Sequence, residues 1–194
     1  MSGRKPGPRK ALPAALCEPQ IRLVGEVNAL LVQSFLDQLD RLPRDAREIA
    51  IEVTTPGGDA DLGRRMVHAV DTWRERFSPR LLFLGTTSVH SAGVTFMGAF
   101  PRSDRYLRRG TILMIHGRQL ERKLEISGSL RSILPQLWEL TAQVELGMEL
   151  EEESFRRLIK GSRISFKEML QRSRHRWYMR AEEALEKGLV AGLL

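Results

Sequence analysis

The sequence is almost devoid of cysteine and contains no long apolar run. Cys17 is the only cysteine among 194 residues, which excludes an internal disulfide and is consistent with a reducing compartment. No apolar run approaches the length of a membrane span, and the apolar stretch 11–17 is interrupted by Pro13, unlike the core of a signal peptide. We therefore expect a soluble, cytoplasmic protein that does not associate with a membrane.

A pattern for nucleic-acid recognition is also missing, although the chain is basic. Lys and Arg number 31 against 24 Asp and Glu, which gives a formal net charge of +7. Acidic residues separate the basic segments, and no zinc-binding, helix-turn-helix or aromatic stacking pattern accompanies them. We expect non-specific attraction to polyanions and no dedicated nucleic-acid site. The basic segments are 1–19, 102–109 and 172–180.

The length and the 42% hydrophobic content fit one globular domain with a sizeable core. Residues 1–20 combine basic side chains with four prolines and show no helical or strand period, which predicts a mobile basic arm. The single domain is expected over 21–194. Its strands and helices alternate, which predicts an α/β fold with a mainly parallel sheet. We expect strands at 21–24, 49–54, 81–84 and 111–115, and helices at 30–42, 62–77 and 92–100.

Two polar residues stand at the ends of predicted strands. Ser91 precedes a run of small and apolar residues and is expected at the N-cap of a short helix, whose unpaired N–H groups can stabilise an oxyanion. His116 follows the strand 111–115. Taken separately, a capping serine and a core histidine are the more ordinary interpretations.

A third motif changes this balance. Strand 49–54 leads into the turn Thr-Pro-Gly-Gly at 55–58, where glycine lets a backbone amide approach a ligand. Together with Ser-Ala-Gly at 91–93 and Met-Ile-His at 114–116, this pattern resembles the proteolytic subunit of the Clp protease, a family of crotonase-fold serine peptidases. The resemblance resumes in Tyr-Met-Arg-Ala-Glu-Glu-Ala at 178–184. It implies a superhelix of ββα units with a mainly parallel sheet and an extended helical handle, here at about 117–164.

The resemblance also implies roles for four residues. Ser91 would be the nucleophile and His116 its general base, while the N–H groups of Gly58 and Ala92 would form the oxyanion hole. It implies no metal and no cofactor in this chain. The family's homo-oligomeric rings and its AAA+ unfoldase partner, which alone would use ATP, are likewise implied.

The position of the family's catalytic acid is occupied by Arg176, and no Asp follows Asp104. Three resolutions follow. His175 could orient His116 as a third member, or a glutamate such as Glu145 or Glu168 could fold back toward the site. Alternatively, the site works as a weak dyad or not at all, since loss of the orienting acid typically costs about 10⁴ in turnover.

The predicted handle contains an amphipathic stripe between Leu130 and Met148. Pro135 is expected to mark the start of its helix, near Leu134, or a kink. We expect this helix to pack against another subunit, with packing onto its own sheet as the alternative.

Two functions of different classes remain open. The first is a serine endopeptidase that cleaves small or unfolded polypeptides through an acyl-enzyme on Ser91. The second is a catalytically impaired pseudoenzyme or structural ring subunit. A third, acyl-CoA chemistry of the crotonase type, shares the fold but leaves Ser91 and His116 without a role.

Overall fold

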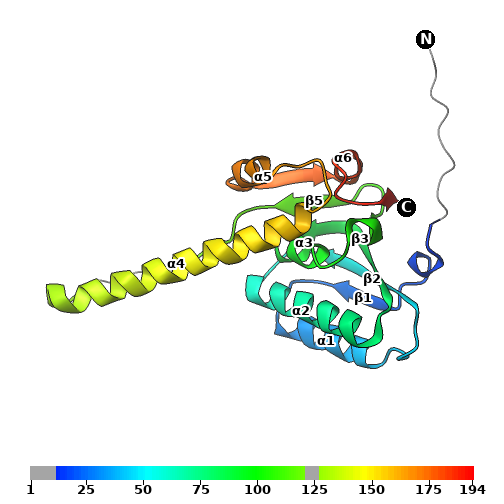
Figure 1. The fold of residues 1–194 in the computed structure, drawn as a ribbon, viewed down its shortest axis with the longest axis horizontal. Helices are drawn as coiled ribbons and strands as arrows, with labels where there is room; N and C mark the ends of the chain where they lie inside the picture. The colour runs from blue at the N-terminus through cyan, green and yellow to red at the C-terminus, as the bar shows by residue number, and fades with distance from the viewer. Residues whose placement is uncertain (1–11, 121–126) are drawn as a thin grey trace, which may run out of the picture.

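The computed structural model describes residues 12–120 and 127–194. In this part of the chain seven strands form one sheet, in the order β1-β2-β3-β4-β7, with β5 pairing with β3 and β6 (Figure 1). All strand pairs are parallel except β5 with β6. The strands are β1 (Ile21–Val24), β2 (Glu48–Thr55), β3 (Arg80–His90), β4 (Arg105–Leu107), β5 (Ile112–Ile115), β6 (Trp177–Arg180) and β7 (Gly192–Leu193). The helices are α1 (Ala29–Asp40), α2 (Ala60–Phe77), α3 (Ala92–Met97), α4 (Leu130–Ile159), α5 (Phe166–Ser173) and α6 (Ala181–Glu186), with two 3-10 turns, η1 (Ala14–Leu16) and η2 (Arg102–Asp104). The predicted α/β class and mainly parallel sheet are confirmed.

Helices α1 and α2 cover one face of the sheet formed by β1, β2 and β3 (Figure 1). Each presents an apolar stripe of helical period, so that Phe35 of α1 and Met66 and Val70 of α2 are buried in the same core. Asp59 caps α2 by accepting hydrogen bonds from the backbone N–H groups of Asp61 and Leu62 at 2.8 and 2.9 Å. This packing fixes the N-terminus of α2 beside the end of β2.

Strand β3 is longer than predicted, because Gly85 does not end it. The register shifts by two residues between the pairs Val53 with Gly85 and Thr55 with Val89, and Thr87 has a φ of 59° at the resulting bulge. The first half of β3 pairs with β4 and the second half with β5. The second half therefore carries the chain to Ser91 at the edge where β5 also ends.

Part of the segment predicted as a mobile arm packs onto the sheet. Residues 1–11 lie outside the described part, but residues 14–16 form η1, and Leu16 is fully buried. Leu16 packs with Leu82 and Leu84 of β3, whose side chains point away from those of Leu81 and Phe83 in the main core. The segment just before β1 therefore covers the second face of the sheet.

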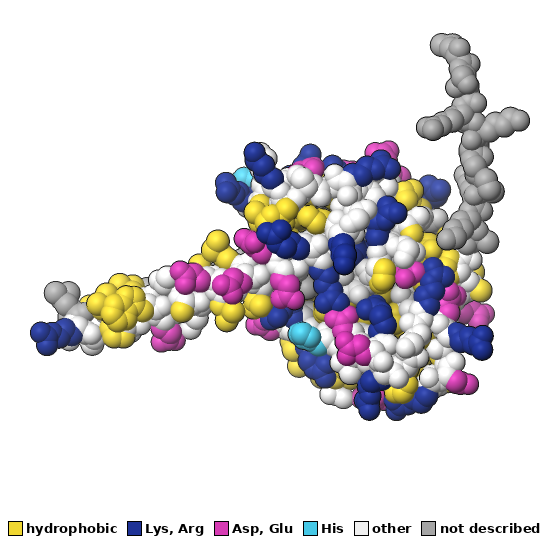
Figure 2. Space-filling model, viewed as in Figure 1, with side chains coloured by type: hydrophobic (Ala, Val, Ile, Leu, Met, Phe, Trp, Pro, Cys, Tyr) yellow, Lys and Arg dark blue, Asp and Glu magenta, His cyan; other side chains and the backbone are white. Residues whose placement is uncertain are grey.

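Helix α4 projects from the body of the protein (Figure 1). It begins at Leu130, so that Pro135 lies inside the helix instead of at its start. Its C-terminal part enters the core through Phe155 and Leu158. The rest of the helix does not pack along the sheet, so the alternative prediction of packing onto its own sheet is wrong for that part. Figure 2 shows hydrophobic side chains along the projecting part. The exposed ones are Leu134, Leu137, Trp138, Val144, Leu146 and Met148.

Length alone does not make α4 a membrane helix. Among the residues that the structure describes, no helix combines the length and the hydropathy needed to cross a bilayer.

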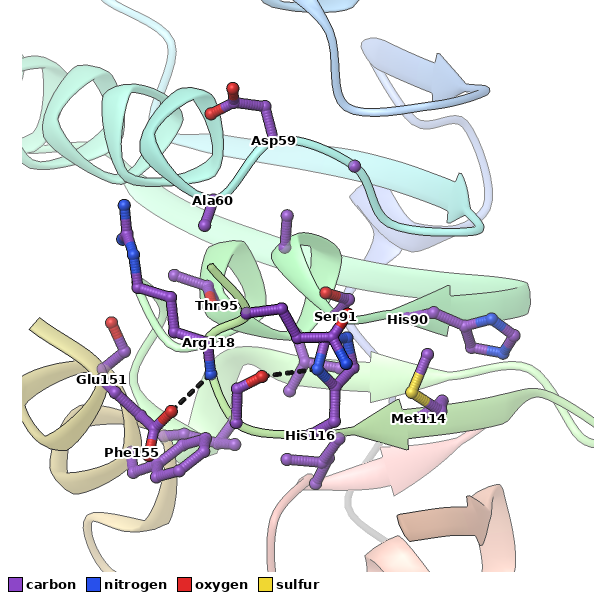
Figure 3. Close-up of a pocket in the computed structure, with 18 of the residues that line it drawn as sticks. Asp59, Ala60, His90, Ser91, Thr95, Met114, His116, Arg118, Glu151 and Phe155 are labelled. Atoms are coloured by element: carbon purple, nitrogen blue, oxygen red, sulfur yellow. Dashed lines mark hydrogen bonds between the residues drawn. The ribbon is translucent and has the colours of Figure 1, made fainter. Parts of the chain in front are cut away.

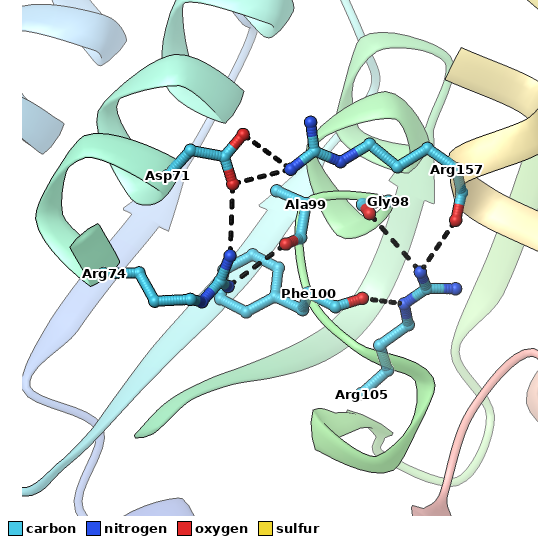
Figure 4. A network of polar contacts seen from close by, with 7 residues as sticks. All are labelled: Asp71, Arg74, Gly98, Ala99, Phe100, Arg105 and Arg157. Atoms are coloured by element: carbon cyan, nitrogen blue, oxygen red, sulfur yellow. Dashed lines mark hydrogen bonds and ion pairs between the residues drawn. The ribbon is translucent and has the colours of Figure 1, made fainter. Parts of the chain in front are cut away.

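The C-terminal end of α4 is held by Arg105, which is 2% exposed. Its guanidinium donates to the backbone carbonyl of Phe100 at 2.7 Å (Figure 4). It also donates to the backbone carbonyl of Leu158 at 2.5 Å and, more weakly, to that of Leu189 at 3.4 Å. Burial lowers the pKa of Arg105 to about 10, and the nearby Arg157 contributes to the same shift. The side chain is still protonated at neutral pH and joins β4, α3 and α4 through its hydrogen bonds.

A second set of ion pairs ties α4 to α2. Asp71 accepts from Arg157 at 2.6 Å and from Arg74 at 3.1 Å, and Arg74 also donates to the carbonyl of Ala99 (Figure 4). All three charged side chains are partly buried, so their geometry is held by packing as well as by charge. The root of the projecting helix is thus fixed relative to α2 and α3.

Candidate active site

A cavity of about 690 Å³ lies between the ends of β3 and β5, the start of α2 and the root of α4 (Figure 3). Its lining includes Gly58, Ser91, Ala92, His116 and Arg176. The structure therefore brings together five of the residues that the sequence singled out. They come from four separate segments, which only the folded sheet places side by side.

Ser91 occupies a strained turn between β3 and α3. Its φ and ψ are 51° and −114°, outside the regions that a residue with a Cβ normally adopts, and its N–H donates to the carbonyl of Met114 at 2.8 Å. It stands at the predicted N-cap of α3, yet its hydroxyl makes no hydrogen bond within the described part of the chain. The hydroxyl of Ser91 therefore does not serve as the helix cap that the ordinary interpretation proposed. A sharp strand-to-helix turn of this kind presents the serine nucleophile in α/β-hydrolases.

The turn after β2 passes directly over Ser91. Gly57 has a φ of 100°, and a Cβ built on it would lie 2.8 Å from the Cβ of Ser91. The turn is fixed by Val27, whose N–H donates to the carbonyl of Gly57 at 2.7 Å and whose carbonyl accepts from Asp59 N–H at 2.8 Å. Glycine is required here both by the backbone angle and by the close approach.

Two backbone N–H groups at the cavity have no hydrogen-bond acceptor among the described residues. One belongs to Gly58, between the two bonds that fix the turn, and the other to Ala92, the first residue of α3. A first-turn N–H has no acceptor within its own helix. Free N–H donors beside a serine hydroxyl are the groups that stabilise an oxyanion.

His116 follows β5, and its ring Nδ1 lies 2.6 Å from the carbonyl oxygen of Gly117 (Figure 3). A carbonyl oxygen only accepts, so Nδ1 carries a proton, and Nε2 is the ring nitrogen left to accept one when the imidazole acts as a base. This is the tautomer that a general base needs. Within the described residues no hydrogen bond joins His116 to Ser91, a contact that often tightens only when substrate binds.

The antiparallel register of β5 and β6 pairs Ile115 with Trp177, so that the next positions outward are His116 and Arg176. Arg176 is exposed, lines the cavity and forms no ion pair with any carboxylate that the structure describes. The register thus places an arginine where the resemblance expected an acid. His175 is exposed and lies outside the cavity lining, and the structure does not bring it to His116.

The two glutamates considered as substitutes for the acid also lie elsewhere. Glu145 is exposed on the projecting part of α4. Glu168 pairs with Lys187 at 3.0 Å, and its backbone N–H donates to the side chain of Ser165, which caps α5. Neither belongs to the cavity lining.

Three carboxylates line the cavity, those of Asp59, Asp61 and Glu151, and the role of the third was missed. Glu151 of α4 accepts a hydrogen bond from the backbone N–H of Arg118, two residues after His116 (Figure 3). The sequence carried one signal of its orientation, because Phe155 and Leu158, four and seven residues later on the same helical face, are buried. Arg118 in turn pairs with Asp61 at 2.7 Å, which joins this segment to α2.

His90 also lines the cavity, although its ring points away from Ser91 (Figure 3). Burial lowers its pKa, and its Nε2 is buried without a partner among the described residues. Its ring packs edge-on against Tyr178. His90 is thus a neutral wall of the cavity. No group of three His, Cys, Asp or Glu side chains in the described ranges could hold a metal ion.

Comparison with known proteins gives the same fold. The family model for Clp protease matches residues 9–194. The solved structure of a ClpP1 mutant from Listeria monocytogenes is similar with a TM-score of 0.70 and 20% identity, over 90% of each chain, and at this identity it shows the fold alone. A search of curated proteins finds no match. The ClpP/crotonase-like fold predicted from the motifs is confirmed, and since the family match spans nearly the whole sequence, this chain belongs to the Clp protease family.

Proposed function

We propose that this chain is a serine endopeptidase that hydrolyses peptide bonds of small or unfolded polypeptides through an acyl-enzyme on Ser91. The single observation that supports it most is the strained Ser91, whose uncommitted hydroxyl shares a cavity with two free N–H donors and His116. Backbone strain at a non-glycine residue persists only where the surrounding structure enforces it, and it concentrates at functional sites.

The reaction follows from these groups. Nε2 of His116 takes the proton of Ser91 Oγ as the oxygen attacks the substrate carbonyl, and the N–H groups of Gly58 and Ala92 hold the oxyanion. The imidazolium then gives its proton to the leaving amine, which leaves an acyl group on Ser91. Water, activated by the same histidine, releases the acyl group and restores the enzyme.

The proposal includes the assembly that belongs to this family. The apolar side chains exposed along α4 favour burial against further copies of the chain, which supports a homo-oligomeric ring. Unfolded substrates would then be delivered by an AAA+ unfoldase that spends the ATP, while this chain itself needs no cofactor. A cytoplasmic location fits such a partner.

An impaired pseudoenzyme or structural ring subunit is the second candidate. It is favoured by Arg176, which stands beside His116 in the strand register, and by the absence of any carboxylate in contact with His116 among the described residues. Acyl-CoA chemistry on the same fold ranks last, because it assigns no role to the strained Ser91 or to the oriented His116.

Labelling with a fluorophosphonate, followed by mass mapping, separates these candidates. The peptidase predicts covalent modification of Ser91 that disappears in Ser91→Ala and His116→Ala and persists in the control His68→Ala, since His68 lies exposed on α2. Native mass spectrometry of the same sample measures the ring. Oligomeric, folded protein that does not label would overturn the peptidase and leave the pseudoenzyme.

A further inference from the structure

One peptide group separates His116 from Glu151. The carbonyl of the Gly117–Arg118 peptide accepts from Nδ1 of His116 at 2.6 Å, and the N–H of the same peptide donates to the Glu151 carboxylate (Figure 3). In a trans peptide these two groups point in opposite directions. Histidine ring, peptide and carboxylate therefore form a continuous hydrogen-bonded chain.

We propose that Glu151 is a positioning residue that takes the place of the missing triad acid, acting on His116 through this peptide group. The inference rests on the proposed peptidase function and deepens it. It differs from the three resolutions that the sequence suggested, because the carboxylate acts through a peptide group and does not contact the histidine.

The first physical reason is polarisation. A hydrogen bond from an N–H to a carboxylate is charge-assisted and roughly twice as strong as a neutral one. Withdrawing the N–H toward a negative charge increases electron density on the carbonyl oxygen of the same amide, so that hydrogen bonds in a chain strengthen one another. The carbonyl of Gly117 becomes a better acceptor for Nδ1–H and for the positive charge that develops on the ring of His116.

The second reason is orientation. The N–H of Gly117 donates to the carbonyl of Ser173 at 2.8 Å, and the side chain of Arg118 pairs with Asp61. With Glu151 on the next N–H, the segment is held from α5, α2 and α4. A segment held from three sides keeps the carbonyl of Gly117, and thereby the ring of His116, in one direction.

The absence of a side chain at residue 117 lets the Glu151 carboxylate approach closely. A Cβ built on Gly117 would lie 2.9 Å from Oε2 of Glu151, which is too close for an unstrained contact. The root of α4 is itself fixed by the hydrogen bonds of Arg105. A helix whose position is fixed therefore places the Glu151 carboxylate against the Gly117–Arg118 peptide, where no side chain of residue 117 intervenes.

The test compares Glu151→Gln and Glu151→Ala in the full chain with the control Glu149→Gln, which removes an exposed carboxylate two residues away on the same helix. Glu151→Gln keeps the shape of the side chain and removes its charge. The first readout is the ring ¹⁵N shifts of the four histidines, with His116 assigned from His116→Gln. The second is the rate of fluorophosphonate labelling.

We expect the wild type and Glu149→Gln to show the Nδ1–H tautomer of His116, and Glu151→Ala to populate the other tautomer. Labelling of the Glu151 variants should fall by roughly 10–100-fold, the range known for groups that orient a metal-ligating histidine through a hydrogen bond. Equal tautomer populations in Glu151→Ala and the control would overturn the proposal, whatever the labelling rates. If the wild type does not label at all, the peptidase function fails, and the tautomer measurement still decides the role of Glu151.

Discussion

Replacing Gly57 by alanine tests whether the turn after β2 belongs to the reaction centre. The added Cβ would lie 2.8 Å from the Cβ of Ser91 and 3.1 Å from the carbonyl oxygen of His90. Carbon atoms in contact prefer about 3.5–4.0 Å, so the turn must move by about 1 Å. Displacement of this size typically costs on the order of 10²-fold in rate, and loss of one oxyanion donor costs about 10²–10³-fold. We expect labelling of Ser91 to slow by about 10²-fold.

The assay must separate this displacement from backbone strain, because Gly57 has a φ of 100° and any side chain is disfavoured there. Gly25→Ala is the matched control, since Gly25 has a φ of 125° and nothing within 4 Å of an added Cβ. Both variants should lose about 1–2 kcal/mol of folding stability from the left-handed backbone. Only Gly57→Ala should lose labelling. Labelling of Gly57→Ala at the wild-type rate would refute the placement of this turn over the nucleophile.

Two further predictions concern stability and are measured by urea unfolding. Leu16→Ala should destabilise the fold by about 2–5 kcal/mol, the usual cost of truncating a buried leucine, whereas Leu12→Ala, at an exposed position, should change little; equal effects would show that η1 does not cover the sheet. Arg105→Lys should cost about 1–3 kcal/mol, because one ammonium cannot reach the carbonyls that the guanidinium fork satisfies and leaves a buried acceptor without a donor. The exposed Arg41→Lys is its control, and an unchanged midpoint in Arg105→Lys would contradict the anchoring role.

The part of the fold that local periodicity governs was predictable from the sequence. The apolar stripes of α1 and α2 and the apolar-polar alternation of β2 follow from spacing alone. The strand predicted at 81–84 continues to His90, and the error has a non-local cause: the two halves of β3 pair with β4 and β5, which come later in the chain. Leu16 was missed for the same reason, because the face that it covers exists only once the sheet has formed.

The candidate site likewise has residues that the sequence predicted and features that only the folded structure shows. Ser91, His116 and the glycine turn carried a recognisable spacing, and the structure gathers them around one cavity. The strained angles of Ser91 arise from the junction of β3 and α3 and are not encoded in its neighbours. Glu151 was one of four glutamates between positions 149 and 153, and only the burial of the same helical face distinguishes it.

Most of the groups that the proposed reaction uses are main-chain groups, namely the N–H of Gly58, the N–H of Ala92 and the carbonyl of Gly117. Side chains around them can change while the backbone keeps its course, which explains how an arginine can occupy the acid position in an intact fold. What an acid contributes is an acceptor that selects the tautomer and a negative charge that stabilises the imidazolium. The carbonyl of Gly117 supplies the first directly. Among the residues that the structure describes, Glu151 is the carboxylate whose hydrogen bond leads to His116, through this peptide, so the strength of that relay decides between an efficient peptidase and an impaired one.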